Sequence, residues 1–83
     1  MTKKDKPKKP LDSRIQKIAD KIKQLRKDSG YTAAETFSYD KKIDRILYWR
    51  MEKGTNFTIT SLLRILDAHE MTLEDFFTDF TDI

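Results

Sequence analysis

The sequence contains no cysteine and only one histidine, His69, and these absences exclude several classes of site. Without cysteine the chain has no disulfide, no thiolate metal ligand and no cysteine nucleophile. A single histidine leaves a zinc site of the usual nitrogen and sulfur type without enough ligands. We therefore expect no metal and no cofactor.

Glycine and long apolar runs are also scarce. Gly30 and Gly54 are the only glycines, so there is no glycine-rich phosphate loop, and no nucleophile has a plausible base beside it. We expect no enzymatic activity and no small-molecule ligand. No apolar run approaches the roughly 20 residues of a membrane span, and the N-terminus lacks the apolar segment of a signal peptide. The expectation is a cytoplasmic protein that does not contact a membrane.

Charged residues are abundant, and they are segregated along the chain. Residues 1–53 hold 16 of the 17 lysines and arginines and eight of the 14 acidic residues, a net charge of +8. Residues 54–83 hold only Arg64 against six acidic residues, a net charge of −5. This asymmetry favours a basic face for a polyanion and an acidic end kept away from it.

The first ten residues differ in composition from the rest. Residues 1–10 carry five lysines and two prolines and, after Met1, no apolar residue. This composition predicts a disordered tail, which either keeps the protein soluble or follows the phosphates of a nucleic acid. Residues 11–83 are expected to form a single small domain.

Apolar periodicity and capping residues predict an all-α fold of five helices in residues 11–83. The first begins with a capping box of Ser13 and Gln16 and stops at Gly30, and the second begins with a capping box of Thr32 and Glu35 and runs to about Tyr39. Thr58 and Thr72 are the expected N-caps of the fourth and fifth helices. The expected core residues are Ile15, Ile18, Ala19, Ile22, Leu25, Phe37, Ile59, Leu62, Leu63, Ile65, Leu66, Leu73, Phe76, Phe77 and Phe80. The last three aromatic residues could instead form a dimer seam.

The third helix, residues 44–53, is the most informative stretch. Asp44 is a good N-cap, Ile43 and Tyr48 are placed to form a hydrophobic staple, and Gly54 supplies the left-handed residue that ends the helix. About nine residues are too few for a helix that is stable alone, so packing must hold it. Tyr48 and Met51 form the expected inward face, flanked by Leu47. The residues left facing outward are Arg45, Ile46, Trp49 and Arg50.

A short helix, a tight link and a second short helix form the pattern of a helix-turn-helix, whose second helix can lie in the DNA major groove. Arginine can donate two hydrogen bonds to guanine O6 and N7, so Arg45 and Arg50 are candidate base contacts; the alternative is two ordinary surface arginines. Trp49 would pack against sugars or thymine methyl groups, or else cover the edge of the core or a partner chain. The residues near the turn either meet the phosphate backbone or belong to a solvated loop; they are Tyr39, Lys41 and Lys42.

Four segments stand in order at nearly the spacing of a known family. Ile22-Lys-Gln-Leu-Arg-Lys-Asp-Ser-Gly-Tyr31 is similar to an opening I-x-x-L-R-x-x-x-G-L, and Arg50-Met-Glu-Lys-Gly54 is similar to a closing R-I-E-x-G. Ser61-Leu-Leu-Arg-Ile-Leu-Asp-Ala68 and Met71-Thr-Leu-Glu-Asp-Phe76 are similar to T-L-L-K-I-A-x-A and V-S-L-D-E-L. Residues 18–77 thus resemble the Xre or phage-repressor family of helix-turn-helix domains, the lambda-repressor-like or Cro-type class.

The resemblance implies a compact five-helix DNA-binding domain in a small bacterial, phage or mobile-element transcription regulator. It implies that Arg45, Ile46 and Arg50 contact base edges and that Glu52 is a scaffold residue. It also implies that the start of the second helix approaches a phosphate, through Thr32, Ala33 and Ala34. Lys42 stands where the family commonly has a glycine, and His69 and Glu70 replace a leucine and a glycine.

Two further expectations concern partners. Small DNA-binding domains usually need two half-sites about one helical turn apart, so we expect a homodimer on double-stranded DNA. Ile46, Leu47 and Trp49 are unusually apolar for a helix that contacts polar base edges. The second interpretation is therefore a non-catalytic protein-interaction module that uses the same helix surface. Neither the target DNA sequence nor the choice between repressor, activator and accessory role follows from the residues.

Overall fold

The computed structural model describes residues 12–78 and residue 80, and these residues form α-helices and no strand. The all-α prediction is confirmed for this part of the chain, whereas the tail predicted for residues 1–10 lies outside the described residues. No helix in the described part is both long enough and apolar enough to span a membrane. The five helices are α1 (Ser13–Asp28), α2 (Ala34–Asp40), α3 (Arg45–Lys53), α4 (Ile59–Ala68) and α5 (Leu73–Phe77).

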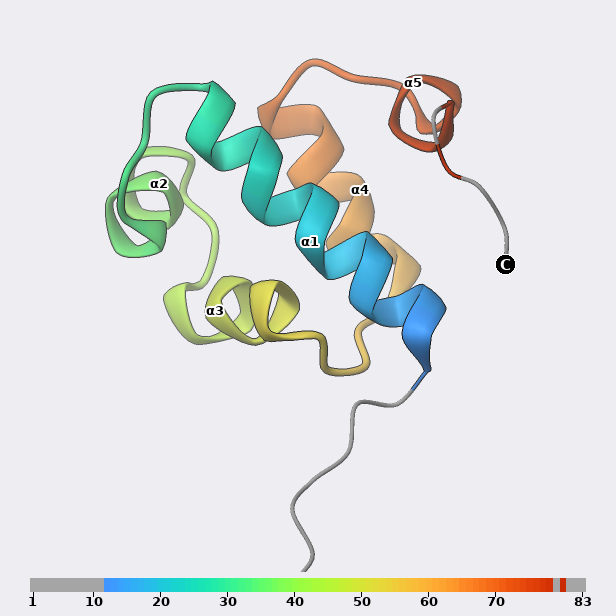
Figure 1. Cartoon of the computed structure of the whole chain (residues 1–83). Coiled ribbons are helices and arrows are strands. Elements are labelled where there is room, and N and C mark those ends of the chain that lie inside the picture. The colour runs from blue at the N-terminus through green and yellow to red at the C-terminus, as the bar shows by residue number, and fades with distance from the viewer. Residues whose placement is uncertain (1–11, 79, 81–83) are drawn as a thin grey trace, which may run out of the picture.

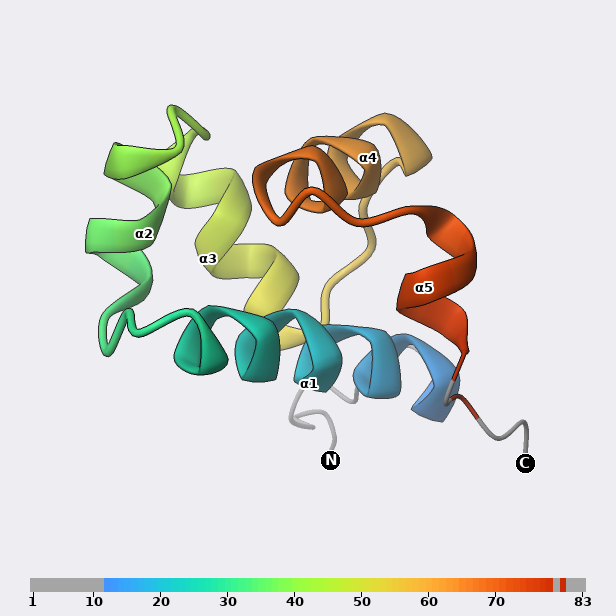
Figure 2. The ribbon, with the colours of Figure 1, turned by 90° about the horizontal axis from the view of Figure 1, so that it is seen from above.

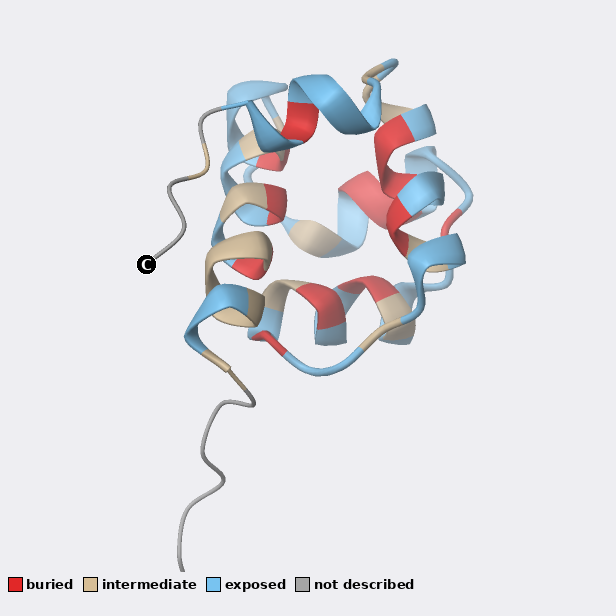
Figure 3. Cartoon of the chain, turned by 90° about the vertical axis from the view of Figure 1, so that its right-hand side faces the viewer, coloured by how far each residue is buried: buried red, intermediate tan, exposed pale blue. Residues whose placement is uncertain are grey.

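The helices pack around one core. α1 extends along the domain, α2 and α3 pack against each other and against α1, and α4 packs against α5 (Figures 1 and 2). The buried segments of the helices face the interior and the exposed segments face outward (Figure 3). One continuous cluster takes buried side chains from all five helices; its members are Ile22, Phe37, Ile43, Tyr48, Met51, Leu62, Ile65, Leu66 and Phe76.

Phe37 is buried in this cluster, as the sequence predicts, and it contacts three other aromatic rings. Its ring centroid lies 5.0–5.2 Å from those of Tyr31, Tyr48 and His69. Tyr31 lies in the segment after α1, Tyr48 lies in α3, and His69 is at the end of α4. Aromatic pairs at this separation are favourable beyond the area that they bury. One side chain of a seven-residue helix therefore anchors α2 to three other parts of the fold.

Several apolar residues predicted to be in the core are exposed instead. Ile59 of α4 is 65% exposed and Leu73 of α5 is 46% exposed, and Leu63 and Phe77 are also on the surface. Each of the two helices buries only a narrow stripe, which consists of Leu62, Ile65 and Leu66 in α4 and of Phe76 in α5. Composition marks these helices as apolar, but packing selects one face.

Both predicted capping boxes in the first two helices are wrong. Asp12, not Ser13, caps α1: its carboxylate accepts from the Arg14 backbone N–H at 2.8 Å and from the Arg14 guanidinium at 3.0 Å. These contacts lower the pKa of Asp12 to about 2, first through the side-chain hydrogen bonds from Arg14. The side chain of Gln16 donates to Asp20 instead of closing a box.

α2 begins at Ala34, two residues after Thr32, and its N-cap Ala33 provides no side-chain hydrogen bond. The carboxylate of Glu35 is not available to the cap because it pairs with Arg45 of α3. The other predicted caps are confirmed: the side chains of Asp44, Thr58 and Thr72 each accept a backbone N–H in the first turn of their helices.

A buried ion pair joins α1 to α3. The Arg26 Nε–Glu52 Oε2 distance is 2.8 Å and the Nη2–Oε1 distance is 3.1 Å, while Nη1 donates to the Tyr31 carbonyl at 2.9 Å. Both side chains are at least nine-tenths buried. The hydroxyl of Tyr48 is buried beside them, and burial, followed by the Glu52 carboxylate, raises the pKa of Tyr48. Glu52 is thus a scaffold residue, in agreement with the expectation from the resemblance.

Candidate nucleic-acid interface

α3 has the bounds, caps and orientation that its sequence predicts. Asp44 accepts from the Leu47 backbone N–H at 2.8 Å, and Gly54 ends the helix with a φ of +93°. Ile43 and Tyr48, the predicted staple, are both buried, and Tyr48 and Met51 face the core. The outward face is also as predicted and consists of Arg45, Ile46, Trp49 and Arg50.

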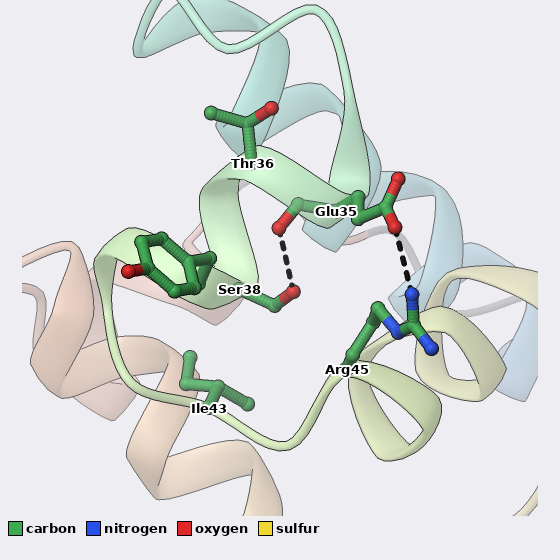
Figure 4. Close-up of a pocket in the computed structure, with 6 residues that line it drawn as sticks. Glu35, Thr36, Ser38, Ile43 and Arg45 are labelled. Atoms are coloured by element: carbon green, nitrogen blue, oxygen red, sulfur yellow. Dashed lines mark hydrogen bonds and ion pairs between the residues drawn. The ribbon is translucent and has the colours of Figure 1, made fainter.

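An ion pair on the surface links this face to α2. The Arg45 Nη1–Glu35 Oε2 distance is 2.8 Å, and about two-thirds of each side chain is exposed (Figure 4). An exposed pair of this kind is worth about 0–1 kcal/mol. Arg45 can therefore exchange Glu35 for another acceptor at little energetic cost.

The Glu35–Arg45 pair lies between two hollows on the surface. The larger, of about 620 Å³, is bounded by α2 and by Ile43 before α3, and Figure 4 shows its lining; the residues are Glu35, Thr36, Ser38, Tyr39, Ile43 and Arg45. The second, of about 390 Å³, is lined by Ala34, Glu35, Arg45, Ile46 and Trp49. Three of the four predicted base-contact residues thus line one hollow.

Trp49 presents an aromatic surface next to a cation. Its side chain is 52% exposed, Ile46 is 50% exposed, and Lys53 Nζ lies 5.2 Å from the Trp49 ring centroid. This distance is within the range of a cation–π interaction. Lys53 was not among the predicted site residues, although it stands one helical turn after Trp49 and its position can be read from the sequence.

The predicted phosphate contacts fall into two groups. Thr32 and Ala33 are exposed and Ala34 is half-buried, and all three lie at the start of α2. Tyr39, which is 85% exposed, Lys41 and Lys42 lie at its other end. Ala34 is the first residue of α2 and Tyr39 is the sixth, so the two groups come no closer along the helix axis than about 7–8 Å. The structure therefore brings the two groups to opposite ends of α2 and does not gather them in one place.

The turn between α2 and α3 contains a backbone conformation that side chains rarely adopt. Lys42 has a φ of +58°, and the flanking Ile43 N–H donates to the Ser38 carbonyl at 2.9 Å. This is the position where the resembled family commonly has a glycine, which adopts positive φ without steric cost. A lysine occupies it here despite that cost.

The charge of α2 and α3 together is close to neutral. Residues 34–53 contain five cations, three of them in α3, and four acidic residues, a net charge of +1. One of the acids, Glu52, is neutralised by Arg26 from α1, and another, Glu35, by Arg45. Most of the +8 charge of residues 1–53 therefore belongs to residues 1–33.

Glu35 is the site residue that the sequence placed in the wrong role. It was expected to cap α2, and it contacts Arg45, ten residues further along the chain. A contact between two helices has no signature in the spacing of either one.

No protein-family model, curated protein or solved structure matches the chain.

Proposed function

We propose that the chain is a sequence-specific double-stranded DNA-binding protein with a lambda-repressor-like fold, and that it regulates transcription. The supporting observation is the exposed face of α3, where Arg45 and Arg50 project from a short helix held by α1 and α2. α3 lies in the major groove, Arg45 and Arg50 donate to guanine, and Ile46 and Trp49 contact thymine methyl groups or sugars.

The two ends of α2 meet the sugar–phosphate backbone in this proposal. Thr32, Ala33 and Ala34 approach one phosphate, and Tyr39, Lys41 and Lys42 approach another. Such contacts fix the position of the protein on the duplex and carry no sequence information themselves. Sequence preference then depends on the two arginines of α3.

Selection of preferred sites from random duplexes, followed by affinity measurements on the selected site, tests the proposal. An Arg45→Ala, Arg50→Ala double variant should lose at least about 30-fold in preference for that site, since each bidentate contact is worth about 1–3 kcal/mol. A Lys23→Ala, Lys27→Ala double variant removes the same charge from exposed positions of α1. It should weaken binding to all duplexes without altering the preference. Absence of duplex binding by the folded wild type at low salt would contradict the proposal.

The chain acts as a homodimer in this proposal, because two copies of α3 about 34–36 Å apart would contact successive major grooves. The selected site should then be a palindrome, and the protein should sediment as a dimer at concentrations where it binds DNA. A monomer that protects a single half-site would contradict this part of the proposal.

The exposed apolar residues of α3 favour a second candidate, a protein-interaction module. Ile46 and Trp49 are half-exposed beside the hollow of about 390 Å³, and tryptophan is a frequent anchor in protein interfaces. Binding to a protein should depend on Ile46 and Trp49 and respond weakly to salt. Binding to DNA should depend on Arg45 and Arg50 and weaken steeply as salt is added.

A further inference from the structure

A third hollow brings together cations from two distant parts of the sequence. It has a volume of about 290 Å³ and lies between the α2–α3 turn and the outer face of α4. Its charged lining consists of Lys41 and Lys42 from the turn and Arg64 and Asp67 from α4. Arg64 is the only lysine or arginine in residues 54–83, and folding places it beside the two lysines.

The three cations of this hollow are available to a ligand. Lys41, Lys42 and Arg64 are exposed, and none of them forms an ion pair within the described residues. Asp67 lines the same hollow without pairing with them and reduces its charge to +2. Three unpaired cations around one small hollow repel each other, and a bound anion relieves that repulsion.

The backbone at Lys42 is a second observation that points to a ligand. A residue with a Cβ atom at a φ of +58° is strained, and glycine would remove the strain. Glu70, which follows α4, has a similar φ of 54°, so the conformation points to a ligand only in combination with the hollow that Lys42 lines. Lys42 directs a charge to the hollow from a position that the fold alone would assign to glycine.

We propose that Lys41, Lys42 and Arg64 form a binding site for a phosphate group. The guanidinium of Arg64 can donate two parallel hydrogen bonds to phosphate oxygens, and the two ammonium groups supply positive charge around it. The phosphate belongs either to the DNA backbone or to a soluble phosphoryl ligand. In the first case the inference rests on the proposed function and adds Arg64 of α4 to the backbone contacts.

His69 provides a reporter close to the site. Burial and, after it, the positive charge of Lys41 lower the pKa of His69. A phosphate bound at Lys41 offsets that charge and should raise the pKa of His69. The shift can be followed by NMR of the His69 ring in the full chain.

The first arm of the test titrates the full chain with pyrophosphate at constant ionic strength. Lys42→Gly and Arg64→Gln should each weaken binding by about fivefold, the upper range for one exposed charge contact. Lys42→Gly should not lower the thermal unfolding temperature, because it removes the left-handed strain. Glu70→Gly is the matched control: Glu70 also has a positive φ, of 54°, and it does not line the hollow. This control should not weaken pyrophosphate binding.

The second arm measures affinity for duplex DNA as a function of salt. Loss of the site should reduce the salt slope by about one in total if it holds one DNA phosphate, because the slope counts the phosphates that the protein neutralises. Pyrophosphate binding that depends on the three cations supports a soluble phosphoryl ligand, and a reduced slope without it supports the DNA backbone. Variants that bind both pyrophosphate and duplex as the wild type does, or a wild type that binds neither, would overturn the site.

The two proposals fail in different ways. Pyrophosphate binding through Lys42 and Arg64 in a protein that does not bind duplex DNA keeps the phosphate site and removes the proposed function. DNA binding that requires Arg45 and Arg50 but is unaffected by Lys42→Gly and Arg64→Gln keeps the proposed function. If pyrophosphate binding is equally unaffected, that result removes the phosphate site.

Discussion

Replacement of Glu52 by glutamine should be among the most destabilising single changes in the domain. The glutamine has nearly the shape of the glutamate, but it carries no charge. The hydrogen bonds that Arg26 donates to the Glu52 carboxylate raise the pKa of Arg26, and the glutamine would remove that effect. Arg26 would still keep its charge in the buried site, because arginine is not deprotonated in proteins. Its remaining acceptors would be neutral: the glutamine amide oxygen and the Tyr31 carbonyl, 2.9 Å from Nη1.

The expected cost is about 3–5 kcal/mol, the usual penalty for removing one partner of a buried ion pair. A chain of 83 residues has a total stability of about 4–12 kcal/mol. Glu52→Gln should therefore remove a quarter or more of the free energy of unfolding. Since the Arg26–Glu52 pair joins α1 to α3, α3 should also become more mobile relative to α1 when stability is lost.

Urea unfolding followed by circular dichroism measures this cost. Glu35→Gln is the matched control, because it makes the same chemical change in a pair with the same 2.8 Å distance that is exposed to solvent. It should cost less than about 1 kcal/mol. If Glu52→Gln does not fold, an Arg26→Met, Glu52→Leu double variant, which removes both charges, should recover stability. Equal costs for the two glutamine variants would refute the reasoning.

Two other predictions concern pH and backbone conformation. His69 has a lowered pKa in the folded state, chiefly through burial, so its contribution to stability is present above the ordinary value of 6.5 and lost as the pH falls below it. In urea unfolding, His69→Phe should flatten the decline in stability between about pH 7 and pH 5. Gly30 and Gly54 both have a φ of +93°, so alanine at either should cost about 1–2 kcal/mol. Thermal unfolding should show the larger loss for Gly54→Ala, whose Cβ would lie 2.5 Å from Gln16 Oε1.

The features of the fold that the sequence predicts correctly are mainly local ones. Asp44 and Gly54 bound α3 where expected, because a cap acts on backbone groups within one turn of itself. Thr58 and Thr72 begin their helices for the same reason. The outward face of α3 follows from helical spacing once Tyr48 is assigned to the core. These predictions depend only on residues within one helix and its caps.

The errors arise where a residue has a competing partner. Asp12 caps α1 in place of Ser13 because its carboxylate can bind both the backbone and the side chain of Arg14. The carboxylate of Glu35 pairs with Arg45 of α3 instead of capping α2. Arg64 lies beside the α2–α3 turn only in the folded chain. A sequence pattern shows which partners are possible, and the three-dimensional packing decides among them.

The near-neutral charge of α2 and α3 separates affinity from specificity in the DNA-binding proposal. Residues 34–53 have a net charge of only +1, so cations outside this unit must add to the attraction that Lys41 and Lys42 exert on phosphates. Arg45 and Arg50 then contribute chiefly by distinguishing bases, and the weak pair with Glu35 lets guanine replace the carboxylate at little cost. The protein-interaction alternative assigns the affinity to different residues, because Ile46 and Trp49 would supply it by burial and the charges around them would only form the rim. Both functions would use the same face of α3. They differ in the residues that supply the binding free energy, Ile46 and Trp49 for a protein partner and cations for DNA.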